Sequence, residues 1–146
     1  MSNWEILEQM AKKMRDDASK AVAETQALID DQSVLRDRTI SILDQYQSRI
    51  IATRKRAGYF RDFQLYQNAI KQLQQGVIQI ESKIRVLEFE IKKRRKKLSQ
   101  AESERQKYVK LIERDKNVEK RRMQRIESAE LDDIGRQIYC RKRHLA

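Results

Sequence analysis

The most concentrated chemical feature of the chain is a run of positive charge. Residues 92–97 read Lys-Lys-Arg-Arg-Lys-Lys, six cations in a row. On a helix such a run surrounds the whole circumference, because each residue turns by about 100°. It can be a solvated surface partly neutralised by acidic side chains such as Asp30 and Asp31, a contact for an acidic protein ring, or a non-specific contact for nucleic-acid phosphates.

The side chains that enzymes depend on are scarce. His144 is the only histidine and Cys140 the only cysteine, so neither a histidine-based triad nor a metal cluster can be assembled. The three glycines lie 18 and 59 residues apart and do not form a phosphate-binding loop. We therefore expect no enzyme, no catalytic or metal-binding residue, no cofactor and no small-molecule substrate. A single cysteine also fits a reducing cytoplasm.

The composition predicts long helices in place of a compact domain with many turns. The 146 residues include no proline, three glycines and 38% charged residues, and turns depend on Gly, Pro and Asn. The net charge of +11 is uneven, since residues 1–49 hold 7 basic and 9 acidic side chains and residues 50–146 hold 26 and 13. No apolar run is long enough to cross a membrane, and the N-terminus has no signal-peptide core. We expect an all-α chain whose second part is cationic.

A heptad repeat predicts the longer of two helices. Steps of four and three from Tyr66 reach fourteen positions, eleven of them aliphatic or aromatic. These positions are Tyr66, Ile70, Leu73, Val77, Ile80, Ile84, Leu87, Ile91, Arg94, Leu98, Ala101, Arg105, Tyr108 and Ile112. A repeat of 3.5 residues indicates a coiled-coil seam. Arg94 must then face the seam and extend its charged end to solvent. Because the basic run lies inside the seam, sequence-specific DNA recognition is not expected.

An earlier, more polar heptad series predicts the partner helix. Its positions are Leu7, Ala11, Met14, Ala18, Ala21, Thr25, Leu28, Gln32, Leu35, Thr39, Ile42 and Tyr46. The alanines allow a close approach, and the polar members can fix the register. Ser2 and Glu5 have the spacing of a capping box that would start this helix.

One turn separates the two helices. Gly58 is a natural helix end and Asp62 a natural N-cap. We therefore expect one domain over residues 1–146: a first helix at about 3–57, a turn at about 56–61 and a second helix at about 62–142. The predicted fold is an antiparallel two-helix coiled coil, a helical hairpin.

The unequal helix lengths predict an overhang at the C-terminal end. The first helix, on the order of 80 Å long, covers the second only to about residue 113. The next register positions, Asp115, Glu119 and Arg122, are charged, so the seam ends at the same place. A separate apolar stripe follows, made of Met123, Ile126, Leu131, Ile134 and Ile138. It could lie along the start of the first helix, or join Trp4 and Leu7 in a docking surface for another protein.

Three segments resemble the FliJ family of flagellar export proteins. Residues 43–47, Leu-Asp-Gln-Tyr-Gln, are similar to the family's Leu-x-x-Tyr segment. Residues 65–73, Leu-Tyr-Gln-Asn-Ala-Ile-Lys-Gln-Leu, are similar to its Tyr-x-x-Phe-Ile-x-x-Leu segment. Residues 130–134, Glu-Leu-Asp-Asp-Ile, resemble its acidic segment near the C-terminus. Ile50 stands where a second Tyr is common, and Ala69 where Phe is common.

The resemblance implies a stalk-like, non-enzymatic part of the bacterial flagellar export apparatus. Family members insert into the hexameric export ATPase ring, contact the cytoplasmic domain of the export gate and handle export chaperones. They lie in the cytoplasm, peripheral to the inner membrane through their partners. By position, the gate surface would comprise Leu43, Tyr46, Ile50, Ala69, Leu73, Gly76 and Ile80. The end with Trp4, Leu7 and the terminal stripe would face the ATPase ring.

Other functions fit the same pattern. A YscO-type stalk of a virulence type III secretion system shares the shape and the heptads. A basic coiled coil associated with nucleic acid would also explain the cations, and a purely structural parallel dimer would explain the heptads without a turn.

Overall fold

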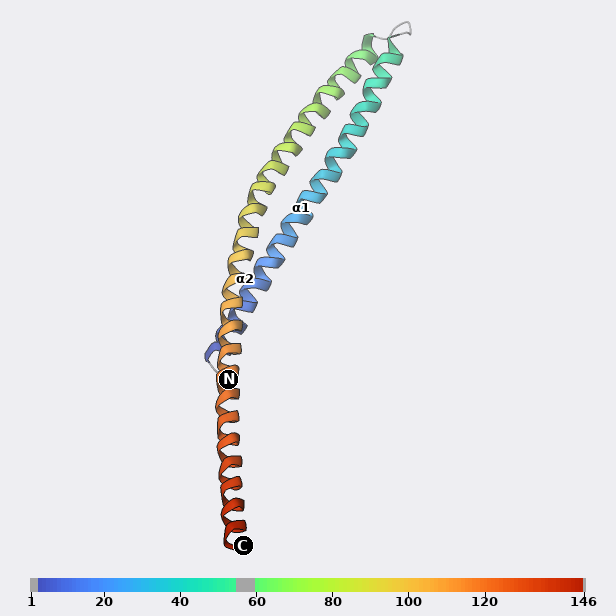
Figure 1. The fold of residues 1–146 in the computed structure, drawn as a ribbon. Coiled ribbons are helices and arrows are strands. Elements are labelled where there is room, and N and C mark those ends of the chain that lie inside the picture. Colours follow the sequence, from blue (N-terminus) through green and yellow to red (C-terminus); the bar gives the residue numbers. More distant parts are fainter. Residues whose placement is uncertain (1–2, 55–59, 146) are drawn as a thin grey trace. The chain divides into compact units, whose positions relative to one another are not determined.

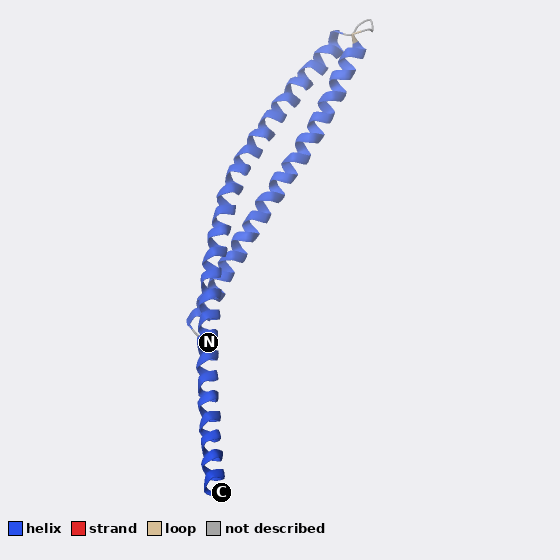
Figure 2. Cartoon of the chain, in the orientation of Figure 1, coloured by secondary structure: helices blue, strands red, loops and turns tan. Residues whose placement is uncertain are grey.

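The chain consists of two long helices. The computed structural model describes residues 3–54 and 60–145. Helix α1 spans Asn3–Thr53 and helix α2 spans Phe60–Leu145 (Figure 1). No residue of the two described ranges lies in a strand (Figure 2). The predicted all-α class is therefore confirmed.

The helix ends differ from the expected ones by a few residues. α1 ends at Thr53 and not near residue 57, while α2 begins at Phe60 and extends to Leu145. Asp62 accordingly lies within the first turn of α2 and is not its N-cap; its charge there still favours the positive end of the helix dipole. Most of the predicted turn at 56–61, with Gly58, lies outside the described residues, as does Ser2.

The chain divides into two compact units. We call residues 15–100 the long unit, and residues 1–14 together with 101–146 the terminal unit. In the long unit α1 and α2 lie side by side (Figure 1). The ring of Tyr46 lies 5.8 Å from that of Tyr66, and Arg94 bonds Thr25, so late positions of α1 meet early positions of α2.

The heptad stripe predicted on α2 is confirmed. All fourteen positions from Tyr66 to Ile112 are buried or half-buried. Ile80, Ile84 and Ile91 are the most enclosed, with 8%, 6% and 4% of their surface exposed. Aliphatic or aromatic residues at eleven of the fourteen steps give this helix one continuous face to bury.

The stripe predicted on α1 is wrong at four of its twelve positions. Met14, Leu28, Leu35 and Ile42 are exposed, at 68%, 53%, 46% and 42%. The buried or half-buried positions of α1 in the long unit instead include Val22, Thr25, Ile29, Gln32, Arg36, Thr39, Leu43, Tyr46 and Ile50. In pairs of neighbours such as Leu28 and Ile29 both residues are apolar, so either one fits the heptad spacing. In the structure the second residue of such a pair is the buried one, as with Ile29.

In the terminal unit, burial ends abruptly along α2. Trp4 of α1 lies against Tyr108 with ring centroids 6.2 Å apart, and Ala11 is 5% exposed. From Glu113 to Leu145 every residue is exposed. No helix in the described part of the chain is long and apolar enough to cross a membrane.

Candidate partner-binding surfaces

A polar cluster interrupts the apolar contact of the long unit. Arg94 Nη1 donates to Thr25 Oγ1 at 2.7 Å and to the Ala21 carbonyl at 3.3 Å, and Nη2 donates to Glu90 Oε1 at 2.6 Å. Thr25, only 1% exposed, donates its own hydroxyl to the Ala21 carbonyl at 2.9 Å. Arg94 thus faces the seam as predicted, but its guanidinium bonds Thr25 and the Ala21 carbonyl of α1, whereas its charged end was expected to extend to solvent. Its partners explain why a cation is tolerated there, since a buried polar group needs hydrogen bonds.

This cluster predicts a specific pattern of stabilities. Thr25→Val should lower the free energy of unfolding by about 1 kcal/mol, because it removes the closer of the two acceptors of Arg94 Nη1. In an Arg94→Met background the same change should cost much less, since there is no guanidinium to lose that acceptor. Urea unfolding of the four proteins measures this coupling. An equal cost of Thr25→Val in both backgrounds would contradict the assigned role of the pair.

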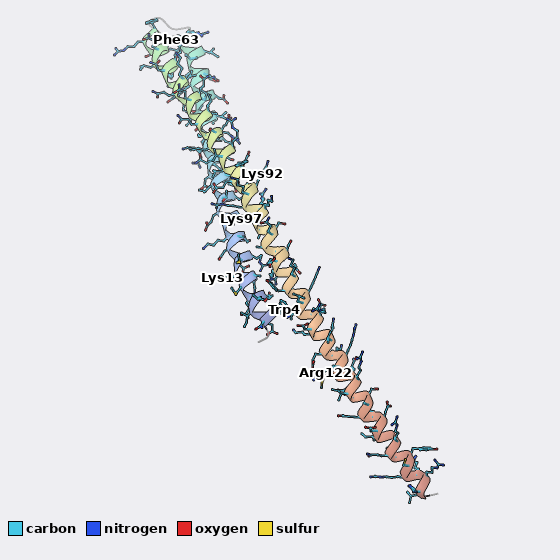
Figure 3. All side chains as sticks on the ribbon, turned by 90° about the vertical axis from the view of Figure 1, so that its left-hand side faces the viewer. Trp4, Lys13, Phe63, Lys92, Lys97 and Arg122 are labelled. Carbon is cyan, nitrogen blue, oxygen red and sulfur yellow. The ribbon has the colours of Figure 1, made fainter. Side chains whose placement is uncertain are left out.

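The rest of the basic run is exposed. Lys92, Lys93, Lys96 and Lys97 are all open to solvent (Lys92 and Lys97 are labelled in Figure 3), and the ammonium of Lys93 lies 4.7 Å from the ring centroid of Phe89. The expected neutralisation by Asp30 and Asp31 is not seen among the described residues. Asp30 instead accepts a hydrogen bond from Gln26 at 3.0 Å, because that amide lies one turn away on the same helix.

The seven residues expected at the export gate lie mainly in the seam. Leu43, Ile50 and Leu73 are half-buried and Ile80 is 8% exposed. Tyr46 meets Tyr66 edge-on, at an interplanar angle of 65°. Their first role is therefore to hold the helices together.

Ala69 and Gly76 differ from the other five because they lie beside the seam. Each precedes a seam residue by one position, and both are half-buried. A Cβ added to Gly76 would meet nothing within 4 Å, so space is open next to it.

A shallow groove runs along the same flank, and the sequence did not identify it. It has a volume of about 370 Å³ and is lined by Leu28, Gln32, Ser82, Lys83, Val86 and Leu87. Gln32 Oε1 is buried there without a hydrogen-bond partner among the described residues. Gly76 and Ala69 precede Lys83 at heptad intervals, and Leu35 and Ile42 follow Leu28 at the same intervals, so all six lie on one side of the helix pair. We define the groove flank as Leu28, Leu35, Ile42, Ala69, Gly76 and Lys83. The recurrence of Leu or Ile every seven residues is visible in the sequence, but it does not distinguish this flank from the seam.

The residues expected at the ATPase ring fall into two groups. Trp4 and Leu7 are half-buried, and Trp4 packs on α2 at Tyr108 (Trp4 is labelled in Figure 3). The terminal stripe is exposed throughout: Met123 47%, Ile126 42%, Leu131 68%, Ile134 52% and Ile138 49%. The described contacts join Trp4 to the seam and not to this stripe. The stripe therefore forms a surface of its own.

Polar contacts lie beside Trp4 in the terminal unit. Arg105 Nε lies 3.4 Å from Glu8 Oε1, an ion pair whose geometry falls short of a hydrogen bond. Tyr108 donates its hydroxyl to Glu104 at 3.2 Å. This bond, with partial burial and the negative charge of Glu104, raises the pKa of the Tyr108 phenol. Tyr108 is therefore neutral at physiological pH and stays a hydrogen-bond donor.

The described residues contain no group of three His, Cys, Asp or Glu side chains that could hold a metal ion. Cys140 is exposed and its sulfur forms no disulfide. The surfaces available to function in the described ranges are thus the basic run, the groove flank and the terminal stripe, all suited to macromolecular contacts.

Comparisons with known proteins give one match. The family model described as flagellar FliJ protein matches residues 2–144. Neither the search of curated proteins nor the search of solved structures found a match. The resemblance to the FliJ family is therefore confirmed. That family is a non-catalytic component family of flagellar export. Since the match covers nearly the whole sequence, the chain belongs to the FliJ family and has a role related to flagellar protein export.

Proposed function

We propose that the chain is a stalk of the flagellar export apparatus, an antiparallel two-helix coiled coil with an unpaired end. In this proposal the exposed end of α2 binds the hexameric export ATPase, and the groove flank binds the cytoplasmic domain of the export gate. Export chaperones are a third proposed partner. The protein would work on the cytoplasmic side of the inner membrane, where its partners hold it.

The observation that carries the proposal is the exposed end of α2. Every residue from Glu113 to Leu145 is exposed, although α2 continues as a helix to Leu145. Helices in proteins owe most of their stability to the packing of an apolar face. A long helix with a stripe of exposed Met, Leu and Ile is therefore suited to burial in another protein, and a ring has a central bore that a single helix fits.

The direction of the contacts supports the antiparallel pairing. Thr25 meets Arg94 and Tyr46 meets Tyr66 in the long unit, and Trp4 meets Tyr108 in the terminal unit. Within the long unit the residue number falls on one helix as it rises on the other. Alternating steps of four and three in the buried positions are typical of a coiled-coil seam.

The groove flank supports a gate contact better than the seam residues do. Leu28, Leu35 and Ile42 expose 53%, 46% and 42% of their surfaces, and such apolar surface favours a partner. Gly76 lets that partner approach the α2 backbone closely, since no atom occupies the space of a Cβ.

A matched pair of substitutions at Gly76 tests the gate surface. Gly76→Ala should stabilise α2 by about 1 kcal/mol, because Ala favours helix and the added methyl meets no atom of the chain. It should weaken gate binding only slightly, since one methyl group fills little of the space left for the partner. Gly76→Glu should weaken gate binding at least tenfold, since it places a charge in the groove flank. Pull-downs with the gate domain and with the ATPase measure both partners, and the ATPase should bind both variants equally. Undiminished gate binding by Gly76→Glu would place the gate contact elsewhere.

A further inference from the structure

The exposed end of α2 separates its charges into an acidic and a basic block. Residues 127–133 contain four carboxylates and no cation, and residues 136–143 contain four cations and no carboxylate. The acidic block is Glu127, Glu130, Asp132 and Asp133, and the basic block is Arg136, Arg141, Lys142 and Arg143. All eight are exposed, and none forms an ion pair with any residue in the described ranges.

An apolar face links the two blocks, with a glycine near its centre. Leu131, Ile134 and Ile138 follow one another at steps of three and four and are about half exposed or more, at 68%, 52% and 49%. Gly135 lies among them in a groove also lined by Leu131, Asp132, Arg136, Tyr139 and Cys140. A Cβ added to Gly135 would meet nothing within 4 Å, so another helix can approach the backbone here.

We propose that this segment binds the same segment of a second copy of the chain, antiparallel and centred on Gly135. A two-fold axis at Gly135 brings each acidic block against the basic block of the other copy, a self-complementary contact. Glu127 then faces Arg143 of the second copy, and Glu130 lies one position away from its Arg141. Leu131 packs near Ile138 of the second copy, and the two glycines leave room at the crossing.

The charge pattern favours this occupant over the others. A parallel pair would place like charges side by side, which is destabilising. A partner of one charge sign would satisfy one block and repel the other. Only a partner with a basic block followed by an acidic block at this spacing satisfies both, and the chain itself provides one. The contact is short and largely electrostatic, so the dimer should form at high concentration and weaken with salt.

Two block variants of the full chain test the proposal. One reverses the acidic block (E127K, E130K, D132K, D133K) and the other reverses the basic block (R136E, R141E, K142E, R143E). Light scattering and sedimentation velocity, in reducing buffer so that Cys140 cannot form a disulfide, give the molar mass against concentration. The wild type should rise from the 17.5 kDa of one chain toward twice that mass. Each variant alone should stay a monomer, because both of its blocks then carry the same sign.

Mixing the two variants provides the decisive measurement. Their equimolar mixture should recover the twofold mass, since each block again faces its opposite. Because all eight side chains are exposed, the helix content measured by circular dichroism should be unchanged in each variant. A wild type that stays monomeric at all concentrations, variants that dimerise like the wild type, or a mixture that remains monomeric would each overturn the proposal. The measurement uses the chain alone, so its result is independent of ATPase or gate binding.

Discussion

A chain that ends at Met123, lacking residues 124–146, should lose binding to the export ATPase while keeping its paired helices. The deletion removes Ile126, Leu131, Ile134 and Ile138, all exposed, and touches no position of the seam. The loss should be about thirtyfold or more, since two or more anchor side chains worth at least 1 kcal/mol each disappear and each 1.4 kcal/mol is tenfold. A pull-down with the ATPase, and the rate of ATP hydrolysis with and without the chain, measure the loss.

Point variants separate the stripe from the length of the helix. The triple variant Leu131→Ala, Ile134→Ala and Ile138→Ala should keep the helix, because Ala has the highest helix propensity. It should weaken ATPase binding nearly as much as the deletion does. Glu119→Ala with Arg122→Ala is the matched control, since these residues pair with each other at 3.4 Å on the same exposed stretch and lie outside the stripe. The thermal midpoint should be unchanged in all of these proteins. Full ATPase binding by the truncated chain would reject the terminal stripe as the contact.

The buried face of α2 could be predicted because the sequence offers no alternative to it. An aliphatic or aromatic residue occupies eleven of the fourteen steps, and its neighbours are charged or amide side chains at most steps. The face of α1 could not be chosen in the same way. Leu28 stands next to Ile29 and Ile42 next to Leu43, so the apolar pattern fits two faces about one residue apart. Packing against α2 selects between them, and that information lies outside α1.

The candidate surfaces show the same limit. The position where burial stops, Glu113, could be anticipated because Asp115 and Glu119 are the next residues on the register. The groove flank could not be anticipated, because in the sequence its exposed residues Leu28, Leu35 and Ile42 look like seam residues. Five of the seven residues expected at the gate lie in the seam, because a helix that carries a family motif must also pack against its neighbour.

Ile84→Asp should unfold most of the long unit, whereas Ile78→Asp should leave it folded. Ile84 is 6% exposed in the middle of the seam, and Ile78 is 61% exposed on the same helix. Both changes carry the same cost in helix propensity, so their difference isolates burial. The substitution at Ile84 removes the apolar contacts of the isoleucine. The new carboxyl group must then either stay charged in apolar surroundings or bind a proton, and both cost free energy. The expected cost is about 4 kcal/mol or more, against less than about 1 kcal/mol at Ile78.

The loss of pairing should appear directly as loss of helix. Long polar helices are marginal without a packed face. Separating α1 from α2 should therefore weaken the negative ellipticity at 222 nm as well as lower the melting temperature. Acidification should partly restore Ile84→Asp, because the buried carboxyl is easier to accommodate when neutral, and should change Ile78→Asp little. If Ile84→Asp melted at the same temperature as Ile78→Asp, the stability of α1 and α2 would not depend on their pairing. The stalk proposal would then lose its support, because it requires the paired helices to form a rigid rod.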